Sequence, residues 1–373
     1  MIILHLTLGL GNGGAEGALF RLITNDGSNK HIVISVMGDG IYGERLRSHG
    51  VEVISFDVKR GKIPFNVPFR ILYYILKIKP DVFQSWLYHS DILGGVLAKI
   101  SGVKRIYWGI RHSNLEPNVN SKTTLIMAKV SALLSTFIPK GIISCSYKAT
   151  QVHVDLGYKE SKFHTISNGY DFSELYFSKS GFDFYRNKYD VSEQFVFGMV
   201  GRWNPQKNHE NLFKALRHYL NKYGSNIKLF LVGPEINEKN SELVTLIDSY
   251  NLWSYIELIG PVSPVNNVMS SFDALVLPSL GEAFPNVLAE SMACGVPVVS
   301  TDVGDASYIV GNTGWIVPSN SPVDLCEAMS ECASLKTNNI DSWNQLKVKA
   351  KTRVKQNFSI EHMVSQFNQA WKA

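Results

Sequence analysis

Short apolar runs rich in β-branched residues recur along this chain, and amphipathic stretches of helical length separate them. Parallel strands need a long crossover between them, and strands buried on both faces read as continuous apolar runs. The alternation therefore predicts an α/β fold in which helices cover both faces of a doubly wound parallel sheet. The first group of expected strands comprises residues 1–7, 32–37, 51–56, 82–86, 105–109 and 142–145.

The alternation stops in the polar and aromatic segment 171–193 and then starts again, and a length of 373 residues fits two domains. We expect two Rossmann-like domains, 1–175 and 176–356, that face each other. The tail 357–373 has apolar residues at helical spacing, which predicts an amphipathic helix that needs a surface to pack against. The second group of expected strands comprises residues 195–200, 228–232, 255–259, 274–277 and 298–301.

The composition excludes several classes of protein. Hydrophobic residues make up 45% and charged residues 18%, so the composition is too apolar for a disordered chain. The net charge of +5 is too small to indicate nucleic-acid binding. The four cysteines show neither a CxxC pair nor zinc-ligand spacing, and no signal-peptide pattern opens the chain, so we expect a reducing cytoplasm. No apolar run reaches about 18 residues, so any membrane contact is expected at the bilayer surface.

A glycine-rich turn follows the first expected strand. Gly9, Gly11 and Gly14 match GxGxxG just before a helix, where backbone N–H groups and the helix dipole favour a diphosphate. A nicotinamide-binding turn has an acidic residue about 20 residues further on. Asp39 is the one candidate, and it lies 30 residues after Gly9, beyond the second strand. An NAD-dependent oxidoreductase and a turn without a ligand therefore both stay open as alternatives.

Two cations follow the first strand of the second domain. Arg202 and Lys207 lie in the loop that leaves residues 195–200, at the edge where open α/β sheets bind ligands. Arg202 can contact phosphate oxygens through its forked guanidinium, while Lys207 acts as a flexible point charge. The alternative is that both are solvated surface cations.

Two carboxylates follow the strand 274–277. Glu282 lies in the loop and Glu290 about one turn into the next helix, whose first N–H groups, near residues 283–288, would face a diphosphate. Because a carboxylate can accept two hydrogen bonds at once, Glu290 suits ribose hydroxyls and Glu282 suits those of a donor sugar. The alternative is that Glu282 forms a capping box with Ser279 and that Glu290 is solvated.

With these residues, the sequence resembles the family-4 glycosyltransferases of GT-B fold, nucleotide-sugar-dependent retaining enzymes that include those of bacterial surface-polysaccharide assembly. The likeness covers essentially the whole chain. Its landmarks are Gly13-Gly14-Ala15-Glu16, Asn168-Gly169, Gly201-Arg202 with Lys207, Leu231-Val232-Gly233, and Glu282 with Glu290 followed by Met292-Ala293-Cys294-Gly295-Val296-Pro297-Val298-Val299.

The resemblance implies roles for these residues. Arg202, Lys207 and Gly14 bind the diphosphate, Glu290 the ribose and Glu282 the donor sugar, and His112 lies near the transferred sugar. The acceptor binds the first domain, and the terminal helix packs back onto it. The chain departs from the common family pattern at Ala283, where glycine is usual. The implied nucleotide-sugar site comprises Gly13, Gly14, Gly201, Arg202, Lys207, Gly233, Pro261, Val262, Glu282, Ala283, Phe284, Pro285, Asn286, Val287 and Glu290.

No two aspartates are spaced i, i+2, so the sequence offers no Asp-x-Asp site for a metal on the diphosphate. We therefore expect no cofactor and no metal, with His112, Glu282, Arg202 and Lys207 as the catalytic set. Preorganised cations would stabilise the leaving diphosphate. The expected reaction is hexosyl or N-acetylhexosaminyl transfer with retention, with UDP as the commoner nucleotide. A covalent route through Glu282 is the lesser option.

Basic residues are concentrated in the first half. Residues 1–175 contain 20 basic and 13 acidic residues, and the remainder contains 17 and 19. The stretches 58–80 and 117–154 contain no acidic residue and interleave cations with apolar side chains. Anionic lipid attracts such cations by about 1 kcal/mol each. These stretches are either a surface for an anionic membrane, or core residues flanked by solvated charges.

A cationic first domain suits a polyprenyl-diphosphate-linked saccharide acceptor and a peripheral location on the cytoplasmic face of the inner membrane. A soluble acceptor is one alternative. The others are an NAD-dependent oxidoreductase, which leaves Arg202, Lys207, Glu282 and Glu290 unexplained, and a non-catalytic protein that binds sugars or nucleotides.

Overall fold

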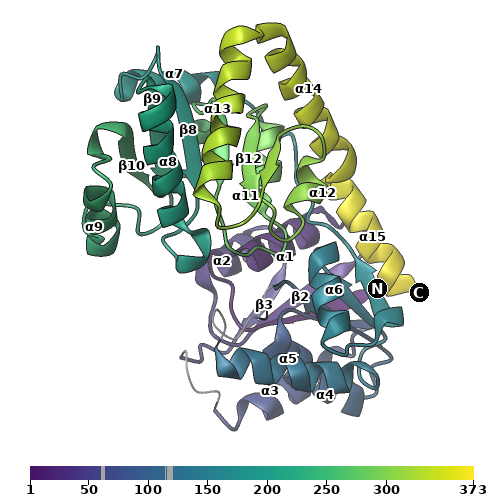
Figure 1. Ribbon diagram of the computed structural model, residues 1–373. Coiled ribbons are helices and arrows are strands. Elements are labelled where there is room, and N and C mark those ends of the chain that lie inside the picture. Colours follow the sequence, from purple (N-terminus) through teal and green to yellow (C-terminus); the bar gives the residue numbers. More distant parts are fainter. Residues whose placement is uncertain (60–63, 114, 116–120) are drawn as a thin grey trace. The chain divides into compact units, whose positions relative to one another are not determined.

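A computed structural model describes residues 1–59, 64–113, 115 and 121–373, and in it the chain forms two compact units (Figure 1). Unit 1 comprises Met1–Gly169 and Ile360–Ala373, and unit 2 comprises Tyr170–Ser359. Tyr170 and Ser359 form a parallel bridge, so the first and last residues of unit 2 lie side by side.

Unit 1 is built on a parallel sheet whose strand order, over the described residues, is β3-β2-β1-β4-β5-β6-β7. This doubly wound arrangement confirms the fold class predicted from the sequence. The direction of winding changes between β1 and β4, which are neighbours in the sheet although two strands lie between them in the chain. The strands are β1 (Ile2–Thr7), β2 (Lys30–Ser35), β3 (Glu52–Ser55), β4 (Val82–Ser85), β5 (Arg105–Ile110), β6 (Gly141–Ser144) and β7 (Phe163–Thr165).

Helices cover both faces of this first sheet. One core joins the sheet to α3, α4, α5 and α6, and a second core joins its other face to α1, α2 and α15. Each helix buries one stripe, as its apolar periodicity predicts. The helices are α1 (Gly14–Asn25), α2 (Gly40–Ser48), α3 (Val67–Ile78), α4 (Tyr88–Ile100), α5 (Lys122–Ser135), α6 (Tyr147–Asp155) and α15 (Ile360–Lys372), and residues Glu160–Lys162 form a short 3-10 helix.

The terminal helix α15 packs into the second of these cores. Trp371 is fully buried and its indole N–H donates to Gln84 Oε1 on β4 at 3.1 Å. Asn368 Nδ2 donates to Asp26 Oδ1 at 3.2 Å, just after α1. Burying each large apolar side chain contributes about 1.5–3 kcal/mol, so α15 is a part of the fold of unit 1.

Unit 2 is built on a second parallel sheet, with the order β10-β9-β8-β11-β12-β13 over the described residues. Its winding changes between β8 and β11. One core joins this sheet to α8, α9 and α13, while α11 and α12 contact β12. The strands are β8 (Phe195–Val200), β9 (Ile227–Val232), β10 (Ile256–Gly260), β11 (Ala274–Leu277), β12 (Val298–Thr301) and β13 (Trp315–Val317). The helices are α7 (Lys179–Lys188), α8 (His209–Tyr223), α9 (Ser241–Ser249), α10 (Val265–Met269), α11 (Asn286–Ala293), α12 (Ala306–Val310), α13 (Pro322–Asn338) and α14 (Ile340–Asn357), with 3-10 turns at Pro205–Lys207 and Trp253–Tyr255.

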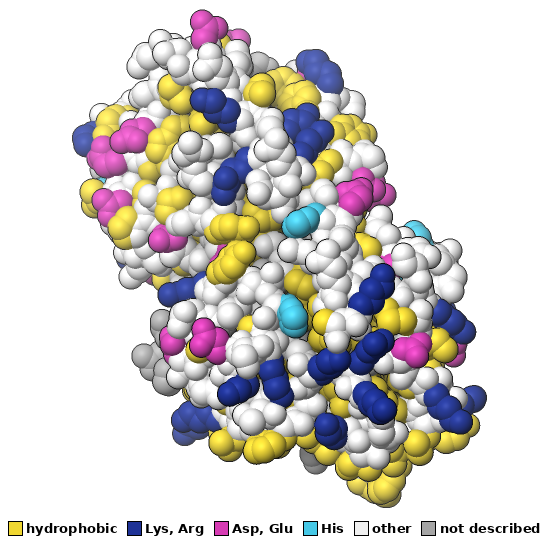
Figure 2. Space-filling view, turned by 90° about the vertical axis from the view of Figure 1, so that its right-hand side faces the viewer, with side chains coloured by type: hydrophobic (Ala, Val, Ile, Leu, Met, Phe, Trp, Pro, Cys, Tyr) yellow, Lys and Arg dark blue, Asp and Glu magenta, His cyan; other side chains and the backbone are white. Residues whose placement is uncertain are grey.

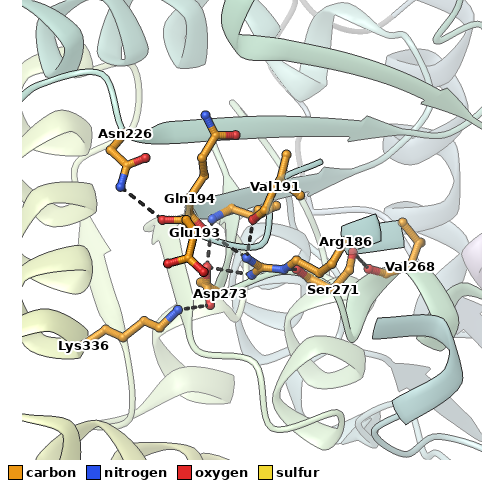
Figure 3. Close-up of polar contacts among 10 residues, drawn as sticks. Arg186, Val191, Glu193, Gln194, Asn226, Val268, Ser271, Asp273 and Lys336 are labelled. Atoms are coloured by element: carbon orange, nitrogen blue, oxygen red, sulfur yellow. Dashed lines mark hydrogen bonds and ion pairs between the residues drawn. The ribbon is translucent and has the colours of Figure 1, made fainter. Parts of the chain in front are cut away.

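A buried ion-pair network fixes α7 to this sheet (Figure 3). Asp273, just before β11, accepts from Arg186 Nη2 at 2.7 Å and from Lys336 Nζ at 2.6 Å. Arg186 also donates to the Val191 and Gln194 carbonyl oxygens, so its guanidinium is well satisfied. The buried residues of α7 are Gly181 and Arg186, so this helix is anchored by a charged side chain and not by an apolar stripe of its own.

No helix among the described residues is long and apolar enough to cross a membrane. The four cysteines are buried free thiols.

Candidate functional site

The candidate site in unit 2 lies where the winding of the sheet changes. β8 and β11 pair directly, with Ala274 opposite Phe197, so their carboxyl ends deliver two loops to one place. These loops are residues 201–208 and 278–285, which contain Arg202, Lys207 and Glu282. Ligands of open α/β sheets bind at such a point because the two loops diverge there and leave a crevice.

The loop after β8 is pressed against the end of β9. Gly201 N–H donates to the Val232 carbonyl at 2.8 Å, and Gly233, at φ 146°, lies so close that a Cβ there would overlap the Gly201 carbonyl. Only glycine fits this position without strain. The chain then makes a 3-10 turn, Pro205–Lys207, whose first N–H is capped by the Asn204 side chain at 3.0 Å. This turn positions Lys207 above Gly201.

The loop after β11 is tied to this turn and brings Glu282 to Lys207. Leu280 N–H donates to the Gln206 carbonyl at 2.8 Å. Glu282 Oε1 accepts from Lys207 Nζ at 2.6 Å and from Ser279 Oγ at 2.9 Å. The Lys207 and Glu282 side chains are 20% and 17% exposed, so the pair is accessible to a ligand without being fully solvated. Both residues were predicted from the sequence, and Ser279 was named there only in the alternative in which it forms a capping box with Glu282.

A third loop supports Glu282 from behind. Asp305 N–H donates to the Ala283 carbonyl at 3.0 Å, and Gly304, at φ 56°, packs so tightly that a Cβ there would overlap the Glu282 and Ala283 carbonyls. The main chain at Glu282 and Ala283 is therefore packed against this loop, while the Glu282 carboxylate accepts from Lys207 and Ser279.

The helix α11 begins directly after this loop. Pro285 is its N-cap residue and makes no side-chain capping hydrogen bond. The N-terminal end of the helix dipole lies next to this loop. The helix begins at Asn286, and Tyr170 donates a hydrogen bond to the Asn286 side chain. Glu290 lies in the second turn and is half-buried. Phe284 is buried against Phe358, with ring centroids 5.5 Å apart.

The remaining cation of the unit 2 site is Arg202, whose side chain is exposed. His209 starts α8 two residues after Lys207, and its ring packs on Trp203 with centroids 4.7 Å apart. Burial, with a smaller contribution from the Lys207 charge, lowers the pKa of His209 to about 4. His209 is therefore neutral at physiological pH and supplies packing rather than charge.

The ends of β9 and β10 meet beside this site. Gly233 N–H donates to the Gly260 carbonyl at 2.9 Å, and Gly260 has φ 75°. Pro261 is exposed and Val262 is half-buried. Backbone groups at this edge can bind a nucleotide base through hydrogen bonds.

Three predicted residues belong to unit 1. Gly13 is the N-cap residue of α1 and Gly14 its first residue. The Glu16 carboxylate folds back onto Gly13, in the manner of the acidic residue of a capping box, so that a Cβ at residue 13 would overlap it. The Glu16 carboxylate therefore lies beside the N-terminus of α1.

His112 lies two residues after β5 and is half-buried. Beneath this edge of the sheet lies a buried polar cluster that sequence reasoning missed. Tyr88 OH and His153 Nε2 are 2.6 Å apart, and His153 Nδ1 lies 2.7 Å from the Ala149 carbonyl. Burial lowers the pKa of His153 to about 4, so its Nδ1–H donates to Ala149 and its Nε2 accepts from Tyr88.

Asp91 belongs to the same cluster. Its Oδ1 accepts from Ser85 Oγ at 2.7 Å and from Gly109 N–H at 3.2 Å, while its Oδ2 is buried and has no hydrogen-bond partner among the described residues. Burial raises the pKa of Asp91 to about 8. A histidine and an acid inside an apolar helix pattern give no sequence signal of such a cluster.

Across the described part of the chain, no three His, Cys, Asp or Glu side chains are arranged to hold a metal ion. The unit 2 site instead combines Lys207, Arg202 and an uncapped helix N-terminus, which suit an anion, with the carboxylates Glu282 and Glu290, which suit hydroxyl groups.

Known proteins similar to this chain indicate its class. Residues 194–334 match the family model described as Glycosyl transferases group 1. The chain is 24% identical over 285 residues to the UDP-Gal:alpha-D-GlcNAc-diphosphoundecaprenol alpha-1,3-galactosyltransferase of Escherichia coli, covering 73% of this chain and 72% of that protein. It is 27% identical over 290 residues to the capsular polysaccharide biosynthesis glycosyltransferase CapM of Staphylococcus aureus, covering 74% of each. An uncharacterized glycosyltransferase of Methanocaldococcus jannaschii is 28% identical over 272 residues, which cover 67% of this chain and 64% of that protein.

Solved structures match the fold over the whole chain. Anabaena HepE in complex with UDP superposes with a TM-score of 0.86 at 20% identity, covering 100% of both chains. A glycosyltransferase from Rickettsia africae gives a TM-score of 0.82 at 21% identity, covering 100% of this chain and 97% of that one. The two parallel-sheet units therefore have a GT-B fold. The family model and the named relatives identify the protein as a glycosyltransferase. The residues that match the Glycosyl transferases group 1 model, 194–334, include the unit 2 candidate site.

Proposed function

We propose that this protein is a family-4 glycosyltransferase that transfers a hexose or N-acetylhexosamine from a UDP-sugar with retention and without a metal ion. The observation that carries the proposal is the Lys207–Glu282 pair at the winding change of the second sheet. A cation and a carboxylate in contact match the two halves of a nucleotide sugar, a diphosphate and a hydroxyl-bearing ring.

In the proposed reaction, the bond between the sugar C1 and the diphosphate oxygen breaks. The acceptor hydroxyl oxygen bonds to C1 on the same face, and its proton passes to the departing diphosphate. Lys207, Arg202 and the α11 N-terminus stabilise the charge that develops on the diphosphate. Glu282 holds the sugar hydroxyls and Glu290 holds the ribose. For His112, Gly13 and Gly14 of unit 1, we propose the roles that the family resemblance implies.

The acceptor is proposed to be a polyprenyl-diphosphate-linked saccharide in bacterial surface-polysaccharide assembly. The names of two relatives support this: one acts on a diphosphoundecaprenol-linked sugar and the other belongs to capsular polysaccharide biosynthesis. The excess of basic residues in unit 1 suits an anionic lipid-linked substrate. On this ground we propose a peripheral location on the cytoplasmic face of the inner membrane.

Product analysis tests this proposal. Transfer from a panel of nucleotide sugars is followed by NMR of the product anomer, with and without excess EDTA. We expect the donor's anomeric configuration to be kept and EDTA to leave the rate unchanged. An inverted product, or a complete loss of activity that Mg²⁺ restores, contradicts the proposed mechanism. Thermal-shift measurements with UDP, GDP, ADP and NAD provide the matched binding test, and stabilisation by NAD alone would favour an oxidoreductase.

A further inference from the structure

Unit 1 exposes a row of large apolar side chains on α3. In the segment 65–78, some apolar side chains face the core and others are exposed to solvent. The inward set is fully buried and comprises Val67, Ile71 and Ile75. The outward set comprises Phe65, Phe69, Tyr73 and Leu76, which are 87%, 67%, 58% and 52% exposed.

The helix α5 repeats this pattern. Ala128 and Ala132 face the core, while Ile126, Leu133 and the following Phe137 are 60%, 75% and 72% exposed. Helix α4 contacts both α3 and α5, so the three helices form one layer (Figure 1), and α4 ends in Ile100, which is 71% exposed. We call the outer surface of α3, α4 and α5 the α3–α5 face.

Positive charge surrounds these apolar side chains. Between residues 58 and 154, the acidic residues that the structure describes are Asp81 and Asp91, and Asp91 is buried, so it adds nothing to the surface. Figure 2 shows Lys and Arg side chains interleaved with hydrophobic ones on the part of the molecule that unit 1 forms. The exposed lysines on or beside the α3–α5 face are Lys77, Lys79, Lys99, Lys122 and Lys129.

We propose that the α3–α5 face docks onto an anionic phospholipid bilayer, with Phe65, Phe69, Leu133 and Phe137 inserted at the headgroup boundary. Interfacial binding needs apolar side chains that enter the acyl boundary and cations that contact anionic headgroups, and this face supplies both. Lysine is depleted from protein–protein interfaces, so a face in which lysines alternate with aromatic residues fits lipid better than a protein partner. This inference rests on the proposed function for the membrane location, and it adds the surface that makes the contact. The two can be tested separately, because vesicle binding requires no catalytic turnover.

Flotation of the full chain with vesicles tests this proposal. Vesicles of phosphatidylcholine with about 30% phosphatidylglycerol are compared with phosphatidylcholine alone, since the cations require anionic lipid. We expect the protein to float with the anionic vesicles, to stay behind with the neutral ones, and to be released at about 0.5 M salt, where surface charges are screened. Failure of the wild-type protein to float overturns the proposal, even if it transfers sugar efficiently.

Two variants test the apolar and the electrostatic contributions to vesicle binding separately. The triple variant Phe69→Ser, Leu133→Ser, Phe137→Ser removes apolar contacts, and Lys77→Glu with Lys129→Glu reverses charge. Each is expected to weaken vesicle binding at least about tenfold, because insertion and headgroup attraction both contribute. The matched control, Val348→Ser with Lys349→Glu, changes the same kinds of exposed side chain on α14 of unit 2 and is expected to bind like wild type.

Circular dichroism and the thermal shift with UDP establish that the variants are folded. Vesicle binding equal to wild type in the folded triple variant overturns the proposal. A second outcome also overturns the proposal: the wild-type protein is a dimer, and the triple variant is a monomer that binds vesicles as well as wild type does. The α3–α5 face would then join two copies of the chain. Vesicle binding without any transfer activity supports this inference while contradicting the proposed function.

Discussion

The two units bury a carboxylate in contrasting ways. In unit 2, Asp273 accepts from two cations, Arg186 and Lys336, and from the Val196 N–H at 2.8 Å. In unit 1, Asp91 accepts from a hydroxyl and a backbone N–H, and no ion pair of Asp91 with a cation is present among the described residues. The first carboxylate therefore serves as a charged cross-link, while the second favours the protonated form.

The contrast teaches that a shared sheet topology does not fix what its buried polar groups do. Unit 2 pairs its charges, both in the Asp273 network and in the accessible Lys207–Glu282 pair. In unit 2, the ion pairs of Asp273 therefore stabilise the fold, while the accessible Lys207–Glu282 pair can contact a ligand. The Asp91 cluster of unit 1 instead consists of groups whose protonation state depends on pH.

The largest expected effect is that of breaking the Asp273 network. Arg186→Met leaves the Asp273 carboxylate buried without its main partner and should destabilise unit 2 by about 3–5 kcal/mol. The loss is measurable as faster hydrogen exchange of β8 and α7 in increasing urea. The matched control is Lys179→Met, which removes the exposed 2.6 Å pair with Asp183 on the same helix and should cost under about 0.5 kcal/mol. Equal effects of the two variants would contradict the structural role of the buried pair.

The second-largest effect is expected for the accessible Lys207–Glu282 pair of unit 2. Lys207→Ala removes a cation from the position of the developing diphosphate charge, and kcat/KM should fall about 100- to 1000-fold. Because Lys207 and Glu282 are in contact, the loss in the double variant Lys207→Ala, Glu282→Ala should be smaller than the product of the single losses.

Steady-state kinetics with the donor identified by product analysis gives these values. Lys222→Ala is the control, since Lys222 also pairs with a carboxylate, Glu327, at 2.7 Å on the surface of unit 2, and it should retain activity within about twofold. A loss below about fivefold in Lys207→Ala would remove Lys207 from the proposed site.

Most of the fold was predictable because buried parallel strands are continuous apolar runs. The exceptions are β7 (Phe163–Thr165) and β13 (Trp315–Val317), edge strands of three residues that are largely half-buried and carry too short a pattern. The helix α7 was also missed, since Arg186 and Asp273 hold it and are far apart in the sequence.

The unit 2 site was predictable in part. Arg202, Lys207 and Glu282 follow expected strands, so their placement at one sheet edge follows from topology. The contact between Lys207 and Glu282 depends on Gly304 and on the hydrogen bond from Leu280 to Gln206, which no local pattern encodes. In unit 1, the sequence around Asp91 predicts an ordinary helix. Whether a cation lies next to this carboxylate depends on the tertiary structure and cannot be recognised from the sequence.

The smallest expected effect tests the unpaired carboxylate of unit 1. Burial raises the pKa of Asp91 to about 8, while an unfolded aspartate titrates near 3.9. Between these values the folded state binds more protons than the unfolded state, so Asp91 lowers stability as pH rises from about 4 to 8. Asp91→Asn keeps an oxygen acceptor for Ser85 and Gly109 but cannot ionise. Its stability relative to wild type should therefore rise by about 2–4 kcal/mol between pH 5 and pH 8.

The measurement is urea unfolding of unit 1 at several pH values, followed by pulsed hydrogen exchange of β4 and β5. Taking the difference between variant and wild type cancels the titration of the other buried groups, including His153, whose lowered pKa makes stability fall on acidification instead. Asp155→Asn, which makes the same substitution at an exposed carboxylate on α6, is the matched control. A flat difference for Asp91→Asn would mean that a cation or water reaches Asp91, and the contrast with Asp273 would then disappear.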